Sequence, residues 1–239
     1  MNNSLANYVV ESLPANTTKI ILLNFAASEL TMRYYESLLS KDETSRLNKI
    51  SLETRRQQFI ITRAVTRKIL ADTIQTTHSE INFRFNEHGK PYCNNPEVVH
   101  FNISHSNNYG VIAINVDHET GIDIQHQRPQ QMLKLAKRFF ANEEIALLEQ
   151  SNDNSLSDTF YRIWARKEAL LKSTGTGLAH GLSQYTVVND KFESDHCCVN
   201  VANRTYYICD IPVPDQYSAA LATHNSNPDI FLCQWQHSE

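Results

Sequence analysis

Two carboxylates occur in segments whose other residues predict regular, partly buried structure. Asp123 interrupts the apolar strand predicted for residues 121–124, and Glu168 lies within the helix predicted for residues 158–173. A buried carboxylate is costly unless it meets a cation, a metal ion or hydrogen-bond donors. If the strand and the helix pack together, the pair could hold Mg²⁺, which takes one or two carboxylates besides substrate phosphates and water. The alternative for Glu168 is a helical ion pair with Lys172, four residues further on.

Ser104 and His105 stand where a predicted strand enters a polar segment. Adjacent residues of an extended chain point to opposite sides, so these two cannot form a nucleophile–base dyad with each other. A segment that offers a hydroxyl and an imidazole is better suited to a phosphate or another polar ligand. The alternative is a turn held by its own hydrogen bonds.

A helix predicted for residues 55–73 carries a row of arginines. Arg56, Arg63 and Arg67 recur at spacings of seven and four, which places them on a face other than the apolar one. Guanidinium groups in such a row could bind phosphates. A solvated helix face is the alternative, and the sequence alone favours it.

Capping residues and hydrophobic periodicity predict the other helices. These helices cover residues 41–49, 131–140 and 142–150. Ser40 is the expected N-cap of the first, with Glu43 completing a capping box, and Asn142 is the expected N-cap of the last. The helix at 158–173 should end near Gly175, since glycine accepts left-handed backbone at a helix end.

The predicted strands divide between two halves of the chain. Residues 111–116 and 121–124 predict two strands joined by a turn, which indicates a β-hairpin. Further strands are predicted for residues 19–25, 81–85, 185–188, 199–201, 206–211, 217–222 and 230–235. The order of elements predicts an α+β fold of two similar halves, residues 1–118 and 119–239. No flexible linker separates them, so we expect the halves to pack tightly.

Composition argues against several classes of protein. The 239 residues include 22 Lys and Arg against 26 Asp and Glu, and a net charge of −4 argues against a dedicated nucleic-acid binder. The six glycines form neither of the common phosphate-binding loops. The five cysteines show no metal-ligand spacing, so we expect reduced thiols. With no membrane-spanning run and no charged signal-peptide start, we expect a cytoplasmic protein.

Several short segments stand out by their order and spacing. They are Gly89-Lys90-Pro91, Phe101-Asn-Ile-Ser-His-Ser106, Gly121-Ile-Asp-Ile124, Lys137-Arg-Phe-Phe140 and Phe160-Tyr-Arg-Ile-Trp164, which runs into Lys167-Glu168 and Lys172. In this combination they resemble the Sfp-type 4′-phosphopantetheinyl transferases, over roughly residues 40 to 185.

The resemblance implies a pseudo-twofold α+β fold with coenzyme A in the cleft between two similar halves. It implies transfer of phosphopantetheine from coenzyme A to a serine of an apo acyl, peptidyl or polyketide carrier protein, with release of adenosine 3′,5′-bisphosphate. It also implies Mg²⁺ bound by Asp123 and Glu168, bridging the pyrophosphate and neutralising charge on the leaving phosphate. Glu168 is then the candidate base for the incoming serine, and Lys172 stabilises or protonates the leaving group.

The resemblance also assigns contacts to coenzyme A. Ser104 and His105 carry over as contacts to its phosphates, above all the 3′-phosphate. Lys90 carries over as a contact to the nucleotide part, and Lys167 is expected to assist at the phosphates.

Two positions depart from the family's pattern. The namesake of the family has a glutamate where this chain has Gln125. Gln125 can offer a carbonyl oxygen or hold a metal-bound water but brings no charge, so we expect it at the metal site with more water around the ion. The family often has an arginine at the position of Gln58, and Arg56 or Arg63 is expected to reach a phosphate instead.

Carrier proteins are typically acidic helical bundles, so the resemblance implies a basic and apolar docking surface. The candidates are Lys134, Lys137 and Arg138, beside Met132, Leu133 and Phe140. Ordinary solvation of a helix is the alternative. The internal pseudo-dimer makes a monomer the simpler expectation.

Two other functions compete with the transferase. A Mg²⁺-dependent phosphodiester or pyrophosphate hydrolase would use the same carboxylates, but it needs a group that positions water, and no additional cluster of that kind is visible. A non-catalytic module that binds coenzyme A or a carrier protein would be favoured if the carboxylates or the lysine were lost. Asp123, Glu168 and Lys172 are all present, which favours the enzyme.

Overall fold

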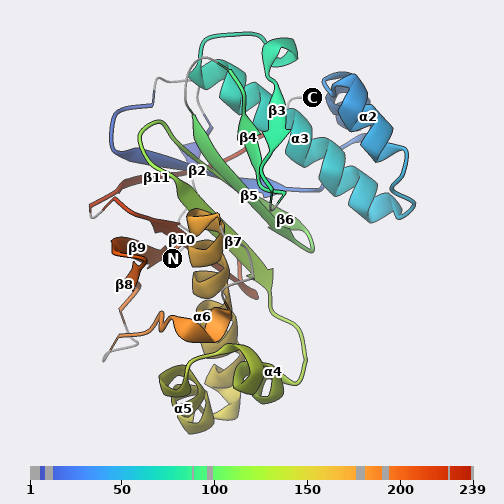
Figure 1. Cartoon of the computed structure of the whole chain (residues 1–239). Coiled ribbons are helices and arrows are strands. Elements are labelled where there is room, and N and C mark those ends of the chain that lie inside the picture. Colours follow the sequence, from blue (N-terminus) through green and yellow to red (C-terminus); the bar gives the residue numbers. More distant parts are fainter. Residues whose placement is uncertain are drawn as a thin grey trace.

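Two β-sheets pack against each other at the centre of the molecule (Figure 1). The computed structural model describes residues 6–8, 13–87, 89–95, 99–175, 181–189, 194–225 and 227–237. The first sheet has five strands in the spatial order β1 (Ala6–Asn7), β11 (Asp229–Gln234), β2 (Thr17–Asn24), β6 (Tyr109–Asn115) and β5 (His100–Ser106). The second has four, in the order β7 (Thr120–His126), β10 (Tyr217–Thr223), β9 (Arg204–Asp210) and β8 (His196–Val201). A separate ribbon pairs β3 (Phe83–Phe85) with β4 (Pro91–Cys93).

Helices cover the outer face of each sheet. The first sheet carries α1 (Glu29–Ser37), α2 (Lys41–Leu47) and α3 (Glu53–Thr73). The second carries α4 (Met132–Phe139), α5 (Asn142–Gln150) and α6 (Asp153–Thr174). Single 3₁₀ turns lie at His78–Glu80 and Leu182–Gln184. This arrangement confirms the predicted α+β fold of two halves.

Strand β2 shows why its apolar run is continuous. Ile20 and Leu22 face the second sheet, whereas Ile21 and Leu23 face the helices of the first half. A strand buried on both faces needs apolar residues at every position. The hydrophobic core therefore has three layers, one between the sheets and one under each set of helices.

The last strand of the chain does not follow the predicted division at residue 118. β11 (Asp229–Gln234) pairs in parallel with β2 and so belongs to the first sheet. Residues 119–239 thus form one half along the sequence, but in space their final strand completes the other half. The sequence predicted a strand at 230–235 but not the strand with which it pairs. An apolar run does not indicate which sheet the strand joins.

Most helix ends agree with the predicted caps. The Ser40 hydroxyl accepts from the Glu43 amide, and Gly175 ends α6 in left-handed backbone, with φ of 69°. The N-cap of α5 is Ala141 and not Asn142, because the Glu144 carboxylate accepts from the Ala141 amide in place of a capping side chain. α6 begins at residue 153, five residues before the predicted start at 158, since Asn152 caps it.

The predicted hairpin of residues 111–124 is wrong. β6 and β7 belong to different sheets, and the hairpin partner of β6 is β5. Side chains of β5 join the two sheets instead: Asn102 Oδ1 accepts from the Ile122 amide at 2.9 Å, and Ser106 Oγ accepts from the His126 amide at 2.9 Å. Alternate residues of β5 therefore bind β7, while Phe101, Ile103 and His105 face the other way.

The cysteine side chains differ in their burial. All five cysteines are free thiols, and Cys197, Cys209 and Cys233 are buried. Burial raises the pKa of the Cys197 thiol to about 11 and that of Cys209 to about 12, which makes them poor nucleophiles. Within the described residues, no helix combines the length and the apolar character needed to span a membrane.

Gly121 allows α6 to lie directly on β7. A Cβ atom at this position would stand 2.1 Å from the Ala169 carbonyl oxygen and 2.3 Å from the Ser173 amide nitrogen. Both atoms belong to the backbone of α6, so neither can turn aside. The glycine before Ile122 thus sets the close approach of the two elements that carry Asp123 and Glu168.

We expect Gly121→Ala to lower the free energy of unfolding by at least about 3 kcal/mol, the upper end of the usual cost of overpacking. Urea unfolding measures the change. Gly110→Ala is the matched control, because its Cβ would meet the ring of Phe25 at 2.9 Å and a ring can move aside. A Gly121→Ala protein as stable as the Gly110→Ala control would contradict the close packing of α6 on β7.

Candidate active site

The centre of the candidate site is the Asp123 carboxylate on β7, whose residue is only 2% exposed. Three side chains donate to it. Ser104 Oγ lies 2.7 Å from Oδ1, Lys172 Nζ lies 2.6 Å from the same oxygen, and Gln125 Nε2 lies 2.7 Å from Oδ2. These donors offset the cost of burying the charge. Three of the predicted site residues are therefore gathered around Asp123.

Glu168 lies on α6, one turn before Lys172, and is half-buried. Within the described part of the chain, no donor hydrogen-bonds its carboxylate. Burial raises the pKa of Glu168, the negative charge of Asp123 raises it further, and Lys172 opposes the shift. The alternative of an ion pair between Glu168 and Lys172 is not what the structure forms, because the Lys172 ammonium is paired with Asp123.

The two carboxylates suit a divalent cation that prefers oxygen ligands. Among the described residues, no group of three or more His, Cys, Asp and Glu side chains could hold a metal ion by itself. Mg²⁺ does not require such a group, since it is usually bound by one or two carboxylates together with substrate phosphates and water. The half-buried carboxylate of Glu168, which has no hydrogen-bond donor among the described residues and lies beside Asp123, is the feature that fits such an ion.

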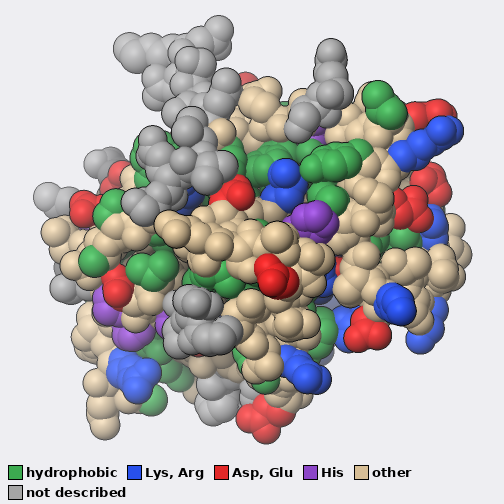
Figure 2. Space-filling model, turned by 90° about the horizontal axis from the view of Figure 1, so that it is seen from above, with side chains coloured by type: hydrophobic (Ala, Val, Ile, Leu, Met, Phe, Trp, Pro, Cys, Tyr) green, Lys and Arg blue, Asp and Glu red, His purple; other side chains and the backbone are tan. Residues whose placement is uncertain are grey.

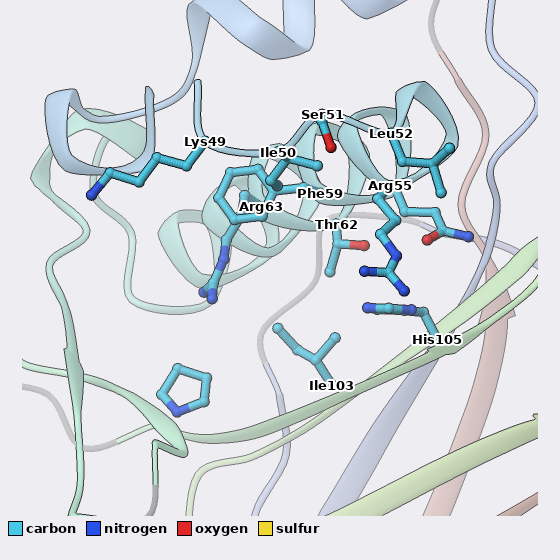
Figure 3. A pocket seen from close by; sticks show the side chains of 12 residues that line it. Lys49, Ile50, Ser51, Leu52, Arg55, Phe59, Thr62, Arg63, Ile103 and His105 are labelled. Atoms are coloured by element: carbon cyan, nitrogen blue, oxygen red, sulfur yellow. The ribbon is translucent and has the colours of Figure 1, made fainter. Parts of the chain in front are cut away.

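A pocket of about 720 Å³ opens between α3 and β5 (Figure 3). Basic side chains from three segments line it: Lys49 before α3, Arg55 and Arg63 on α3, and His105 on β5. The side chains of Arg55 and His105 approach each other, and Arg63 points into the cavity. A pocket of this volume holds a small-molecule ligand, and its charge favours an anionic one.

Apolar groups accompany the cations of the pocket. Phe59 and Ile103 line its wall, and the Arg63 guanidinium lies 5.8 Å from the ring centre of Phe59 and 5.3 Å from that of Phe83. Figure 2 likewise shows hydrophobic side chains gathered beside basic and histidine side chains on the face seen from above. Such a lining suits a ligand that has both phosphates and a flat ring.

The electrostatics of the pocket leave two groups ready for an anion. Burial lowers the pKa of Arg63, and its buried Nη1 atom has no hydrogen-bond partner within the described ranges. Burial lowers the pKa of the His105 imidazole, and the positive charge of Lys172 lowers it further. A bound phosphate would compensate both effects, because it brings negative charge and hydrogen-bond acceptors.

Three residues expected at coenzyme A have other partners here. The Arg56 guanidinium donates to the Leu47 carbonyl at 2.8 Å and so holds the end of α2. Lys167 is 2% exposed and pairs with Glu144 at 2.7 Å, away from the residues that line the pocket. The side chain of Lys90 contacts Glu119 and two backbone carbonyls.

Ser104 contacts Asp123 and not the pocket, whereas His105 lines the pocket. The opposite directions of adjacent residues on a strand, used above to exclude a dyad, account for both positions.

Arg67, the third arginine of the predicted row, is 3% exposed and pairs with Glu43 at 2.7 Å. Gln58, at the family's arginine position, donates to the Asn107 carbonyl at 2.7 Å.

Arg55 and Lys49 are basic residues of the pocket lining that were not predicted from the sequence. Arg55 precedes Phe59 by four residues and Arg63 by eight, a spacing that keeps all three near one side of α3. This spacing could have identified Arg55 from the sequence, but the seven-residue interval from Arg56 to Arg63 fits one side of a helix equally well. Only the packing of α3 on the first sheet distinguishes them.

Comparison with known proteins assigns the chain to one family. Residues 119–222 match the model of the 4′-phosphopantetheinyl transferase superfamily, and residues 25–117 match that of the N-terminal part of a 4′-phosphopantetheinyl transferase. The chain belongs to the 4′-phosphopantetheinyl transferase family.

Individual relatives cover parts of the chain. The 4′-phosphopantetheinyl transferase ffp of Bacillus subtilis is 30% identical over 166 residues, which cover 64% of this chain and 73% of the relative. The 4′-phosphopantetheinyl transferase HetI of Nostoc is 36% identical over 145 residues, which cover 59% of this chain and 61% of the relative. The match thus spans about three fifths of the length of HetI. The crystal structure of Thermotoga maritima holo-[acyl-carrier-protein] synthase aligns with 44% of this chain and 61% of its own at 18% identity and a TM-score of 0.30, a likeness too slight to establish a shared fold.

Proposed function

We propose that the protein transfers the 4′-phosphopantetheine group of coenzyme A to a serine of an apo carrier protein and releases adenosine 3′,5′-bisphosphate. The observation that carries the proposal is the pairing of Asp123 with Lys172 beside the carboxylate of Glu168, which no donor in the described part of the chain contacts, in a chain of this family. Its neighbour is a basic pocket in which Arg55, Arg63 and His105 are placed for the phosphates of coenzyme A.

The chain's own groups can carry the proton transfers. The serine hydroxyl of the carrier attacks the phosphorus next to pantetheine, a new P–O bond forms, and the bond from that phosphorus to the bridging oxygen breaks. Glu168 would accept the serine proton, and in the metal-free protein its raised pKa makes it a stronger base than an ordinary glutamate. Lys172 donates to the oxygen of the departing phosphate, and its bond to Asp123 holds the ammonium in place.

Asp123 and Glu168 would hold Mg²⁺, with Gln125 as a carbonyl ligand or as the partner of a bound water. Bound there, the ion would supply positive charge to the pyrophosphate oxygens. Ser104 and Gln125 donate to Asp123 and thereby fix the direction of its carboxylate. In many metal sites, partners of this kind affect affinity almost as much as the ligands do.

The carrier protein would dock on α4. Leu133 is 37% exposed on this helix, and the neighbouring Lys134 is also exposed. Lys137 shares its charge with Glu149 at 3.0 Å, so it is available to an acidic partner only in part. Phe140 is 3% exposed and stacks on Phe160, which removes it from the docking surface. The proposal further places the protein, as a monomer, in the cytoplasm.

Intact-mass spectrometry of an apo acyl carrier protein tests the proposal directly. After incubation with this protein, coenzyme A and Mg²⁺, we expect a gain of one phosphopantetheine, which EDTA abolishes. Fatty-acid, polyketide and peptidyl carriers should each be tried. Binding of coenzyme A without a mass gain on any carrier would instead support a non-catalytic binding module.

Replacement of Gln125 by Glu should lower the Mg²⁺ concentration that gives half the maximal rate, by about threefold or more. A third carboxylate adds negative charge beside Asp123 and is a better ligand for a hard cation than an amide oxygen. The measurement is a Mg²⁺ titration of the transfer rate. Gln127→Glu, two residues further on, is the control, since Gln127 bonds to Asp158. An unchanged Mg²⁺ dependence in Gln125→Glu would place residue 125 away from the ion.

A further inference from the structure

The side chain of Lys90 meets three segments of the chain at one point. Its Nζ lies 2.7 Å from Oε2 of Glu119, 3.4 Å from the carbonyl oxygen of Thr120 and 3.0 Å from that of Lys172. An ammonium group has three N–H donors, and these three acceptors match that number. The geometry therefore leaves Lys90 no donor for a ligand, although its neighbour Pro91 lines the pocket.

The segments that Lys90 joins are those that carry the proposed chemistry. Thr120 begins β7, three residues before Asp123. Lys172 lies in the last turn of α6, one turn after Glu168, and its own side chain reaches Asp123. Lys90 itself precedes β4, on the side of the chain that forms the pocket.

A cation is well placed at this end of α6. The last carbonyl groups of a helix have no partner within the helix, and the helix dipole makes that end negative. The Lys172 carbonyl is one of them, and Lys90 from the other half of the chain donates to it. Lys90 thus caps α6 from outside the helix.

Glu119 fixes the position of the ammonium. Its carboxylate also faces His100 Nδ1 at 3.4 Å, and these two partners hold the pKa of Glu119 at about 2. The side chain of Lys90 is 17% exposed, so water competes little for its donors.

We infer that Lys90 and Glu119 form a positioning pair that aligns β7 and the end of α6, and with them Asp123, Glu168 and Lys172. The inference rests on the proposed function for what is aligned, and it replaces the expected direct contact of Lys90 with the nucleotide. Lys90 acts through the backbone of Lys172 and Thr120 and touches no reacting group.

The two roles of Lys90 predict opposite kinetics for Lys90→Met. An alignment role lowers kcat at least tenfold, changes KM for coenzyme A less than twofold, and raises the Mg²⁺ concentration for half-maximal rate at least threefold. If Lys90→Met only reduced the fraction of folded protein, the apparent kcat would fall but the Mg²⁺ concentration for half-maximal rate would not change. A direct contact would instead raise KM and weaken the binding of adenosine 3′,5′-bisphosphate, measured by calorimetry, with kcat unchanged.

Glu119→Gln provides the second variant, because Glu119 lies outside the pocket lining. Alignment predicts that it reproduces the loss of kcat in Lys90→Met and that the double variant loses little more. Lys68→Met, which loses a contact to Tyr34 Oη at 3.4 Å, is the control and should match the wild type. A normal kcat in Glu119→Gln would overturn the inference.

Hydrogen exchange separates this inference from the proposed function. The amides of residues 172–175 should exchange at least tenfold faster in Lys90→Met and Glu119→Gln than in the wild type, with or without any transfer activity. Unchanged exchange there would refute the positioning pair even in an active transferase. Faster exchange in a protein that modifies no carrier would leave the pair intact and refute only the transferase.

Discussion

Glu168→Gln is expected to lower kcat for phosphopantetheine transfer at least a thousandfold while the free energy of unfolding changes by less than about 1 kcal/mol. General base catalysis contributes on the order of a hundred- to ten-thousandfold, and the same substitution removes a charge from the proposed Mg²⁺ site. The stability should be nearly unchanged, because no donor of the described residues bonds the Glu168 carboxylate and glutamine has the same shape.

The measurement pairs intact-mass kinetics with urea unfolding. Glu36→Gln is the matched control, since Glu36 is an exposed glutamate on α1. A Glu168→Gln protein within tenfold of the wild-type rate would show that Glu168 is neither the base nor a needed metal ligand. A large loss of stability would show instead that the carboxylate has a structural partner.

The pH profile gives an independent test of Glu168. Without Mg²⁺, the Glu168 carboxyl should titrate above the ordinary glutamate value of about 4.3, because burial and the negative charge of Asp123 raise its pKa. A pKa that is higher in the folded than in the unfolded protein contributes stability at low pH, and that contribution disappears as pH rises through the folded value. Glu168→Gln should therefore gain stability relative to the wild type as pH rises from about 4 to 8. The measurements are an NMR titration and urea unfolding of the metal-free protein, and a Glu168 carboxyl that titrates at or below 4.3 would contradict the shift.

Strand β5 shows what the sequence can predict about the site. The alternation of a strand already sends Ser104 and His105 to opposite sides, and the structure uses one side for Asp123 and the other for the pocket. The helix of Glu168 and its end at Gly175 were equally predictable, since amphipathic spacing and a terminal glycine are local signals.

What the sequence could not predict depends on partners far along the chain. Lys90 meets Glu119, and Arg67 meets Glu43, at distances in sequence of 29 and 24 residues. A basic residue on a helix or in a loop gives no local sign of whether it is solvated, paired or free for a ligand. The false hairpin of β6 and β7 has the same origin, because Asn102 and Ser106 of β5 take the β7 amides that a hairpin would use.

Lys167 is the clearest case of a basic residue whose role depends on distant partners. Its ammonium donates to Glu144 and to the carbonyl oxygens of Leu182 and Tyr185, at 2.7, 2.7 and 2.5 Å. Glu144 is 0% exposed, and its carboxylate also accepts from the amides of Ala141 and Val187. The pair thus fastens α5 and the segment after α6 to the helix that carries Glu168.

Lys167→Met is therefore expected to lower the free energy of unfolding by about 3–5 kcal/mol, the usual cost of leaving one member of a buried ion pair without its partner. Lys167→Met combined with Glu144→Gln should recover at least half of that loss, because the second substitution removes the uncompensated buried charge. Urea unfolding of both variants measures this, with Lys41→Met, an exposed lysine of α2, as the control.

Kinetics distinguish this structural role from the phosphate contact that the family resemblance implies for Lys167. Loss of a phosphate contact would raise KM for coenzyme A in Lys167→Met and leave its stability near that of Lys41→Met. Loss of the buried pair leaves KM of the folded fraction within about twofold, since Lys167 does not line the pocket. The double variant distinguishes the two roles. If Lys167 has the structural role, removing the charge of Glu144 restores stability. If Lys167 contacts a phosphate, the second substitution restores nothing, because it cannot replace a cation at the phosphate.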